Sequence, residues 1–431
     1  MNKLRLFFII AISASPIIAF NSSAQSETSA SDANIRIVPC GTKVPSLKRG
    51  VCANKLSEAD FRAFAPGVSW YYNWHYKSDM HPPSDAKMEF IPQVWGDSKG
   101  DVAGLDSYLG SVSVKPPVVL GVNEPNLRGQ AFISPEETAK LVLKIKAVAD
   151  KYHIPVVAPN MALGSSGNDS IKAMDPIENK MVTYTFFVPF LKAFFHFLGG
   201  NDQVAGIGLH SYGNIGELKW ATGEMYKQFG KPVWMTEYAN WNAKNGDAVN
   251  YLIDATEFLE NNPHVGGYAW FKERANNASI SLLEKEPGKL SELGKYYVGL
   301  PAHDTKLYYR LPGKLDAADY ATISNAKLTI TNDKDAVGLF QVNPEGDAAE
   351  ATYNLQVDNE GDYTISVHTF AGMTAKDPVE IYKGDKLLGS AVTTQHAWET
   401  VDTKIHLEKG LNTLRVKLND HLLGWFNFAS L

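Results

Sequence analysis

The sequence is poor in cysteine, because its 431 residues include only Cys40 and Cys52. Neither has a histidine close by in the sequence, which argues against a zinc site or a catalytic thiol. The chain also lacks HxH and HExxH motifs. We therefore expect neither a metallohydrolase nor any bound metal, and no cofactor.

Basic residues are not in excess either: 41 Lys+Arg stand against 47 Asp+Glu, and the net charge is -6. A nucleic-acid-binding protein normally carries a basic face, so this charge argues against one. The same balance gives no support to an electrostatic role at a membrane surface.

The chain lacks an apolar run of the roughly 20 residues that span a bilayer. Residues 1–24 read as a secretory signal: Lys3 and Arg5 precede the apolar run 6–18, and small residues precede Gln25. We therefore expect a secreted or periplasmic protein without membrane insertion, and a flexible segment over 25–44.

If the protein is exported, its two cysteines meet an oxidising compartment in which a disulfide can form. Cys40 and Cys52 are 12 residues apart, and we expect them to be bonded. Two free buried thiols are the alternative.

Hydrophobic residues make up 44% of the chain and charged residues 20%, which is typical of a folded protein. At about 150 residues per domain, the length suits a barrel plus a smaller unit. Eight apolar runs predict strands, at 49–52, 68–74, 89–95, 117–124, 155–160, 206–210, 232–237 and 266–271. Helical patterns lie between them, at 134–152, 184–198, 216–229 and 247–261. This alternation predicts an α/β fold, a (β/α)8 TIM barrel over 45–302, with abbreviated helices in its first two units.

Helical periodicity ends near residue 303. Short alternating runs follow, at 327–331, 337–342, 350–357, 362–369, 379–382, 386–392, 399–407 and 412–418. Gly-containing turns separate several of them, for example 360–362 and 383–385. The pattern predicts a second domain over 303–431, an all-β jelly-roll sandwich.

Two carboxylates carry the chemistry. In a (β/α)8 barrel the reaction takes place at the carboxyl ends of the strands. The fourth predicted strand ends on Asn123 and Glu124, and the seventh on Glu237. Paired carboxylates on opposite walls of a barrel mouth suit glycoside hydrolysis, with one protonated and one ionised. Alternatively, one glutamate caps a helix or forms a salt bridge.

Aromatic residues predict a cleft. Seven of the nine tryptophans lie between Trp70 and Trp270, and sugar rings stack on such side chains. We expect substrate contacts from those at or just past strand ends: Tyr72, Trp74, Trp95, Trp241 and Trp270. Trp70, Trp220 and Trp234 are assigned to packing. Tyr212 and His210 follow the sixth strand. We expect Tyr212 to contact substrate, and His210 to bond substrate, to position Glu237 or to form a structural pair with a carboxylate.

Six motifs, taken together, resemble glycoside hydrolase family 128. They are SWYYNW (69–74), EFIPQVWG (89–96), LGVNEPN (120–126), GLHSYG (208–213), VWMTEY (233–238) and YAWF (268–271). This family belongs to clan A, whose members are retaining hydrolases, and it acts mostly on the interior of β-1,3-glucans. The resemblance implies that Glu124 is the acid/base and Glu237 the nucleophile. Asn123 is expected to bond the substrate 2-hydroxyl, or else to hold the strand end.

The second domain resembles a family 6 carbohydrate-binding module. The resemblance lies in residues 315–320, 360–364, 393–398, 411–416 and 425–428. Members bind glycan through a loop Trp and a late Asn, which Trp398 and Asn427 match. The resemblance implies an accessory glycan site on these two residues.

The sequence thus predicts a monomeric retaining endo-β-1,3-glucanase whose partner is a β-1,3-glucan polysaccharide or oligosaccharide. An exo-acting enzyme, a hydrolase of another β-glucan linkage and a non-catalytic glucan-binding protein are the alternatives.

Overall fold

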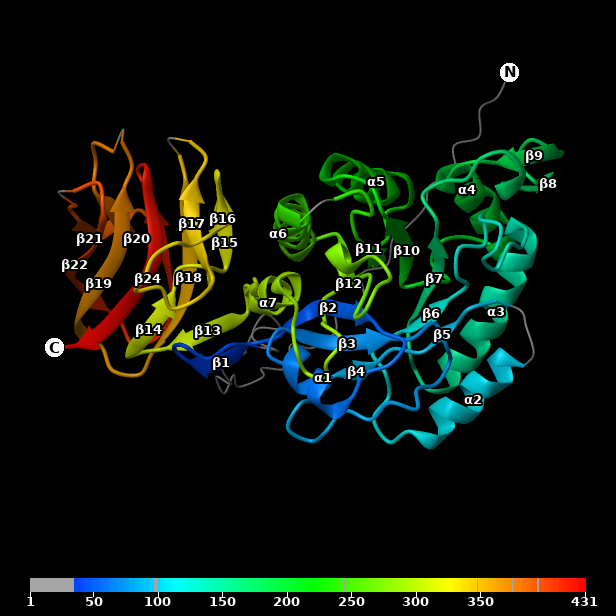
Figure 1. Ribbon diagram of the computed structural model, residues 1–431, viewed down its shortest axis with the longest axis horizontal. Coiled ribbons are helices and arrows are strands. Elements are labelled where there is room, and N and C mark those ends of the chain that lie inside the picture. Colours follow the sequence, from blue (N-terminus) through cyan, green and yellow to red (C-terminus); the bar gives the residue numbers. More distant parts are fainter. Residues whose placement is uncertain (1–34, 97–99, 244, 347, 374, 394) are drawn as a thin grey trace, which may run out of the picture. The chain divides into compact units, whose positions relative to one another are not determined.

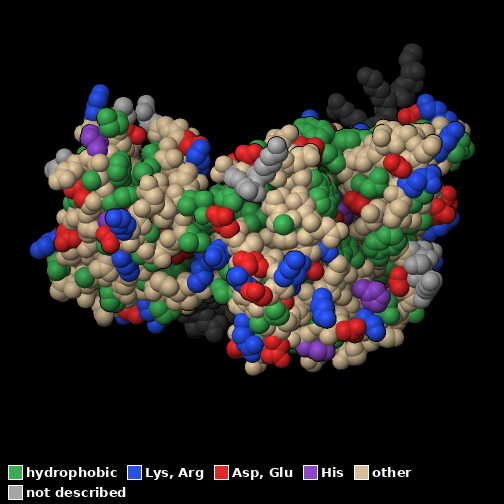
Figure 2. All heavy atoms as spheres, viewed as in Figure 1, with side chains coloured by type: hydrophobic (Ala, Val, Ile, Leu, Met, Phe, Trp, Pro, Cys, Tyr) green, Lys and Arg blue, Asp and Glu red, His purple; other side chains and the backbone are tan. Residues whose placement is uncertain are grey.

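The structure is a computed structural model that describes residues 35–431 except 97–99, 244, 347, 374 and 394. The predicted signal peptide, 1–24, and residues 25–34 therefore lie outside the described residues. Within the described part of the chain, no helix is both long and apolar enough to cross a membrane. On the face drawn in Figure 2, acidic and basic side chains are interspersed.

A curled sheet of nine parallel strands forms the first half of the fold (Figure 1). Its order is β4-β3-β2-β12-β11-β10-β7-β6-β5. The bounds are Ser46–Cys52 (β2), Val68–Tyr72 (β3), Glu89–Phe90 (β4), Gln93–Val94 (β5), Val119–Gly121 (β6), Val156–Met161 (β7), Gly206–Ser211 (β10), Val233–Tyr238 (β11) and Val265–Trp270 (β12). All eight predicted strands are present, one of them split into β4 and β5. These two edge strands are separated by only Ile91 and Pro92.

Helices follow the strands along the chain. They are Glu58–Phe64 (α1), Asp101–Ser111 (α2), Pro135–Lys151 (α3), Phe187–Leu198 (α4), Ile215–Phe229 (α5), Asn245–Asn261 (α6) and Glu292–Gly299 (α7), with short 3-10 turns at Gly167–Asp169 and Ala278–Ile280. Helix α3 begins as predicted: Ser134 accepts from the Glu137 backbone N–H, and Glu137 accepts from the Ser134 N–H. Helix α4 falls within the predicted helix 184–198 and buries most of its phenylalanines.

The segment after β7 differs from expectation. Residues 161–183 read as a polar loop, but they contain most of an antiparallel hairpin, Ile171–Asp175 (β8) and Lys180–Tyr184 (β9). Its alternation is weak because Met174 and Met181, which pair across the hairpin, are both about half exposed. In β8 the buried face carries Asp175 as well as Ile171, and the exposed face carries Met174. Residue type therefore does not follow burial, which leaves no clear period-2 pattern in the sequence.

The second half is all-β and consists of two sheets, with orders β1-β13-β18-β23-β20-β21 and β16-β17-β24-β19-β22. Strand β15 joins the first sheet by pairing with β18, and β14 joins the second by pairing with β24. The sheets face each other, since Tyr353 of β18 and Phe426 of β24 pack with ring centroids 4.9 Å apart. The bounds are Leu307–Arg310 (β13), Gly313–Asp316 (β14), Thr322–Ser324 (β15), Ala326–Ile330 (β16), Phe340–Pro344 (β17), Glu350–Val357 (β18), Gly361–Ala371 (β19), Val379–Lys383 (β20), Lys386–Ala391 (β21), Trp398–Leu407 (β22), Gly410–Lys417 (β23) and His421–Ser430 (β24).

One strand of the second half comes from the beginning of the chain. Residues Arg36–Pro39 form β1 and pair in parallel with β13. The expectation of a flexible segment over 25–44 is therefore wrong for these residues. Four residues carry too little pattern to show a strand whose partner lies some 270 positions later.

The predicted disulfide is also wrong, since Cys40 and Cys52 are both free. Cys52 ends β2 inside the curled sheet, fully buried, with its sulfur 3.6 Å from the Tyr72 hydroxyl. Cys40 follows β1 and packs against Gly313 in the all-β half. Cys40 follows a strand of one sheet and Cys52 ends a strand of another, which their short sequence separation does not reveal.

Candidate active site

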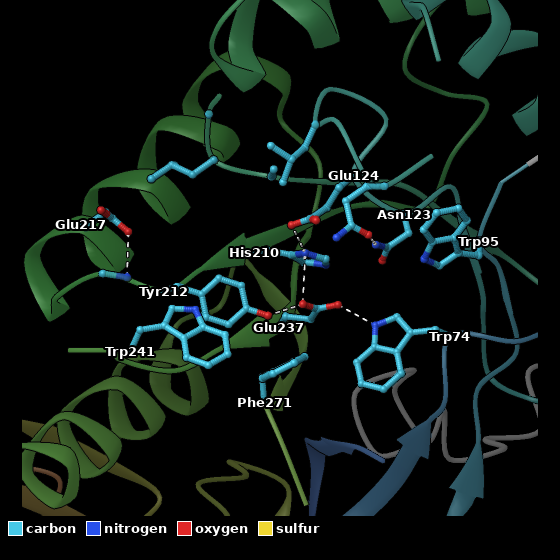
Figure 3. A pocket seen from close by; sticks show the side chains of 16 residues that line it. Trp74, Trp95, Asn123, Glu124, His210, Tyr212, Glu217, Glu237, Trp241 and Phe271 are labelled. Carbon is cyan, nitrogen blue, oxygen red and sulfur yellow. Dashed lines mark hydrogen bonds and ion pairs between the residues drawn. The ribbon is translucent and has the colours of Figure 1, made fainter. Parts of the chain in front are cut away.

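A cleft of about 760 Å³ lies at the carboxyl ends of the parallel strands. Its lining includes eight of the predicted site residues: Trp74, Trp95, Asn123, Glu124, His210, Tyr212, Glu237 and Trp241 (Figure 3). Glu124 and Glu237 lie near its middle, with aromatic side chains to either side. The volume is within the usual range for a ligand site.

Glu124 lies on a strained turn directly after β6. Val122 and Glu124 adopt φ angles of 38° and 42°, which are rare for residues other than glycine and costly for a β-branched valine. Backbone bonds hold this turn: the Val122 N–H donates to Val94 and the Glu124 N–H to Asn160, at 2.8 and 2.7 Å. The strain therefore persists because neighbouring strands enforce it, and it directs Glu124 into the cleft.

Glu237 is surrounded by donors. The Trp74 indole N–H donates to Oε1 at 2.6 Å, and the Tyr72 hydroxyl lies 3.2 Å from the same oxygen. The Tyr212 hydroxyl donates to Oε2. Donors to both oxygens fix the orientation of the carboxylate, as an attacking group requires.

The two tyrosines remain donors over the whole neutral range. Burial, reinforced by the charge of Glu237, raises the pKa of Tyr212 well above its ordinary value. Burial likewise raises the pKa of Tyr72. Both hydroxyls therefore keep their protons beside the carboxylate.

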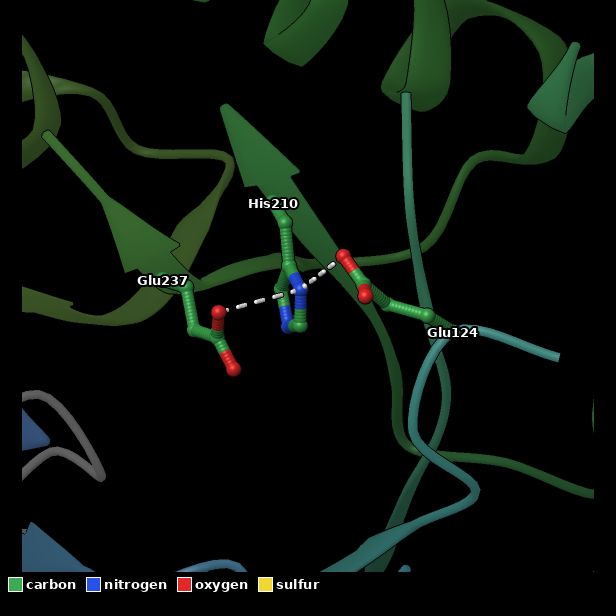
Figure 4. A group of neighbouring side chains, drawn as sticks. All are labelled: Glu124, His210 and Glu237. Carbon is green, nitrogen blue, oxygen red and sulfur yellow. Dashed lines mark hydrogen bonds and ion pairs between the residues drawn. The ribbon is translucent and has the colours of Figure 1, made fainter. Parts of the chain in front are cut away.

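His210 lies between the two carboxylates (Figure 4). Its Nδ1 is 2.8 Å from Glu124 Oε1 and 3.4 Å from Glu237 Oε2, and one oxygen of each carboxylate lies within 4.8 Å of the other. Burial alone would lower the pKa of His210, but the charges of Glu237 and Glu124 outweigh it and raise the pKa. This placement favours the positioning role and the carboxylate pair over direct substrate binding.

A buried chain of hydrogen bonds assigns the tautomer of His210. The Asn160 amide N–H donates to the Gly121 carbonyl, so its oxygen faces the Thr236 hydroxyl, which donates to it at 3.1 Å. The Thr236 oxygen then accepts from His210 Nε2, also at 3.1 Å. Nε2 therefore carries a proton, and Nδ1 is left to exchange a proton with the carboxylates.

The same three side chains, Glu124, His210 and Glu237, are close enough together to hold a metal ion. The sequence motifs had given no sign of such a group. The Glu237 carboxylate already accepts hydrogen bonds from Trp74, Tyr72 and Tyr212. N–H and O–H groups that point at a site stabilise a negative charge there, whereas a metal ion would be a positive charge. The surroundings thus fit a nucleophilic carboxylate better than a metal ligand.

Two of the predicted aromatic contacts differ from expectation. Tyr72 is fully buried beneath Glu237 and positions the carboxylate instead of stacking on sugar. Trp270 is wrong as a cleft residue, because it is fully buried and its indole N–H donates to the Ile280 carbonyl. Phe271, the next residue, lines the cleft in its place. A shift of one residue at a strand end turns a side chain to the other face.

Asn123 is buried at the cleft wall and is already bonded. It accepts from the Gln93 amide at 3.3 Å and donates to Gln130 at 3.1 Å. Sequence reasoning missed Gln130 and also Glu217, which lines the cleft and accepts from the Gly213 N–H and the Ser211 hydroxyl. The helix-capping spacing of Asn214 and Glu217 after the sixth strand could have indicated Glu217.

The two predicted accessory residues lie apart in the all-β half. Trp398 of β22 pairs with Phe370 and stacks on His368, while Asn427 of β24 pairs with Ser366. Four positions along β19 separate these partners, about 13 Å at the usual strand rise. Trp398 and Asn427 therefore do not form one compact site.

Comparisons with known proteins agree with this geometry. A family profile described as "Glycosyl hydrolase catalytic core" matches residues 50–297. A GH128 (subgroup II) endo-β-1,3-glucanase from Sorangium cellulosum is 33% identical, over 60% of this chain and 100% of its own, with a TM-score of 0.51. One from Pseudomonas viridiflava is 28% identical, over 60% and 99%, with a TM-score of 0.49. A subgroup I enzyme from Amycolatopsis mediterranei, in complex with laminaritriose, is 21% identical, over 58% and 98%, with a TM-score of 0.45. A search of curated proteins found no match.

A parallel α/β sheet with two carboxylates at the carboxyl ends of its strands defines the class, a glycoside hydrolase. Because the family profile covers more than half of the chain, and the chain spans the whole Sorangium cellulosum enzyme, the chain belongs to glycoside hydrolase family 128.

Proposed function

We propose that this protein cleaves β-1,3-glucan within the chain, with Glu124 as acid/base and Glu237 as nucleophile in a retaining mechanism. The observation that carries the proposal is the approach of the two carboxylates to within 4.8 Å on either side of His210. Retaining enzymes have carboxyl groups about 5–5.5 Å apart, whereas inverting enzymes need about 6.5–9.5 Å for a water between them.

The first step breaks the glycosidic bond. Glu237 attacks the anomeric carbon, the Glu124 carboxyl proton passes to the leaving oxygen, and a glycosyl ester forms on Glu237. In the second step Glu124, now ionised, takes a proton from water, and the hydroxide oxygen attacks the anomeric carbon and releases Glu237. When His210 is protonated, its Nδ1–H, 2.8 Å from Glu124, donates to that carboxylate and stabilises it between the steps.

Two features support internal cleavage and the glucan linkage. Trp74 and Trp95 lie on one side of the carboxylates, and Tyr212 and Trp241 on the other (Figure 3). Sugars can therefore stack on both sides of the bond that breaks. The Sorangium cellulosum relative is an endo-β-1,3-glucanase.

The test uses the full chain and two variants, Glu124→Gln and Glu237→Gln, with a β-1,3-glucan, a β-1,6-glucan, a mixed-linkage glucan and cellulose. We expect the wild type to release a ladder of oligosaccharides from the β-1,3-glucan alone. The first products should keep the β configuration by NMR. Each variant should lose at least about a hundredfold in kcat, the lower range for removing a positioned proton-transfer group.

An aryl β-glucoside or aryl laminaribioside with an acidic leaving group separates the two roles. Such a group departs without protonation, so Glu124→Gln should still form the glycosyl ester in a rapid burst. Glu237→Gln should form none. Release of α-configured product, or only glucose from chain ends, would reject the retaining or the endo part of the proposal.

We also infer three features of the whole chain. The sheet is a closed (β/α)8 barrel, supported by edge strands β4 and β5 that lie only two residues apart. The facing β-sheets form a jelly roll resembling a family 6 carbohydrate-binding module, in which Trp398 and Asn427 contact glycan separately. The protein is exported, as the signal-like residues 1–24 indicate.

A further inference from the structure

Trp220 lies on helix α5 with about half of its surface open to solvent. Its position in a predicted helix had assigned it to packing, yet 51% of its surface is exposed. It stacks on Phe186, just before α4, with ring centroids 5.6 Å apart and planes 27° apart. Two adjacent rings at the surface make a small apolar platform.

This platform adjoins the cleft. Phe186 pairs with Gly164, and Gly164 lines the cleft. Glu217, another lining residue, lies three positions before Trp220 on the same helix. Helical side chains lean towards the N-terminus, so the Trp220 indole covers the turn that carries Glu217.

The direction of the cleft also leads towards helix α5, which carries Trp220. Figure 3 shows Trp95 at one side of the carboxylates and Glu217 at the other. A linear ligand that enters past Trp95 and crosses the carboxylates therefore leaves beside Glu217. Helix α5, which carries Glu217, also carries Trp220 of the Trp220–Phe186 pair.

We propose that Trp220 and Phe186 form an outer binding platform for the part of a long β-glucan chain that extends beyond the cleft. The proposal rests on the proposed function, because it takes the ligand to be the same glucan. A flat aromatic face suits the C–H face of a sugar and needs no fixed hydrogen-bond pattern. The platform would make long chains bind more tightly than short ones without contacting the reacting bond.

The experiment measures binding in the Glu237→Gln background, where the ligand survives. Laminari-oligosaccharides from two to eight sugars are titrated calorimetrically into Glu237→Gln and into the same protein with Trp220→Ala or Trp220→Phe. We expect Trp220→Ala to raise Kd about tenfold for the longest oligosaccharides and to leave Kd unchanged for the shortest. Trp220→Phe, which keeps a ring, should recover part of the difference.

Two further variants make the result specific. Leu143→Ala removes another exposed apolar side chain, on α3, and should change no Kd. Trp241→Ala, inside the cleft, should weaken short and long ligands alike. If Trp220→Ala affects all lengths equally or none, the platform is refuted while the proposed function stands. If Glu237→Gln binds none of the oligosaccharides, both the proposed function and the platform fail.

Discussion

Glu237 receives hydrogen bonds from side chains that follow different strands. Trp74 and Tyr72 belong to β3 and the turn after it, and Tyr212 follows β10. At a single residue, three donors give an anion more stabilisation and a narrower range of orientations than one donor can. In the proposed mechanism, this preorganisation lets Glu237 attack without first rearranging its surroundings.

The Thr236 hydroxyl gives a test at the same scale. Thr236→Val keeps the shape but removes the acceptor for His210 Nε2–H. This hydrogen bond is stronger when the ring is protonated, so its loss lowers the pKa of His210. Because His210 bridges Glu124 and Glu237, we expect the alkaline limb of the kcat/KM profile to move to lower pH. The shift should be up to about one unit, the equivalent of one hydrogen bond.

The measurement is kcat/KM against pH for wild type, Thr236→Val and Thr236→Ser. The serine variant retains the hydroxyl and should follow the wild type. A valine profile that overlies the wild-type profile would mean that the hydroxyl plays no part in the proton balance.

At the scale of the elements, strand β10 must pass very close to strand β7. A Cβ placed on Gly208 would lie 1.9 Å from Asn160 Oδ1 and 2.8 Å from the Asn160 Cα. The amide that orients Thr236 thus occupies the space a side chain would take. Glycine is required here by close approach, and the chemistry of β11 depends on it.

We therefore expect Gly208→Ala to displace Asn160 and to lower both stability and kcat. The cost should be about 1–3 kcal/mol, as for other overpacked interiors. Gly223→Ala on α5 is the matched control, since no atom lies within 4 Å of its Cβ position; it should stabilise by about 0.5–1 kcal/mol. Thermal unfolding and kcat measure both. Unchanged kcat in Gly208→Ala would argue that Asn160 does not position the site.

The elements also explain which predictions held. Runs such as 155–160 and 232–237 were identifiable because strands buried on both faces read as continuous apolar sequence. Hairpin β8–β9 and the ten-residue strand β24 were missed, the first for its exposure and the second for its mixture of glycine, polar and aromatic residues. Trp270 and Phe271 show a further limit of sequence-based prediction. The exact residue at which a strand ends decides which of two neighbouring side chains faces the cleft, and the sequence does not fix that residue.

At the scale of the whole molecule, His303 connects the two halves of the fold. It lies between Glu257 of α6, 3.0 Å from Nε2, and Tyr320, whose ring it stacks on at 3.8 Å. Burial lowers the pKa of His303, but the charge of Glu257 outweighs it and raises the pKa. Burial raises the pKa of Glu257, but His303 and the other partners outweigh it and lower the pKa.

The two shifts set a pH window. The histidine contribution is present below its unfolded pKa, near 6.5, and is lost as the pH rises through the raised folded value. The glutamate contribution is present above its unfolded pKa, near 4.3, and is lost as the pH falls through the lowered folded value. We expect His303→Gln to cost about 3 kcal/mol between those limits and less on the alkaline side. Urea unfolding at several pH values checks it; a cost that does not vary with pH would contradict it.

The sequence by itself determined the alternation of strands and helices, the all-β second half and the two carboxylates at strand ends. These follow from local periodicity and from the rule that parallel strands end at one edge of a sheet. Only the tertiary structure decided that His210 bridges Glu124 and Glu237, that Cys40 and Cys52 lie apart, and that Trp220 is exposed beside the cleft. Each of those depends on residues far apart in the chain, whose side-chain directions are set by packing between strands and helices rather than by neighbours in sequence.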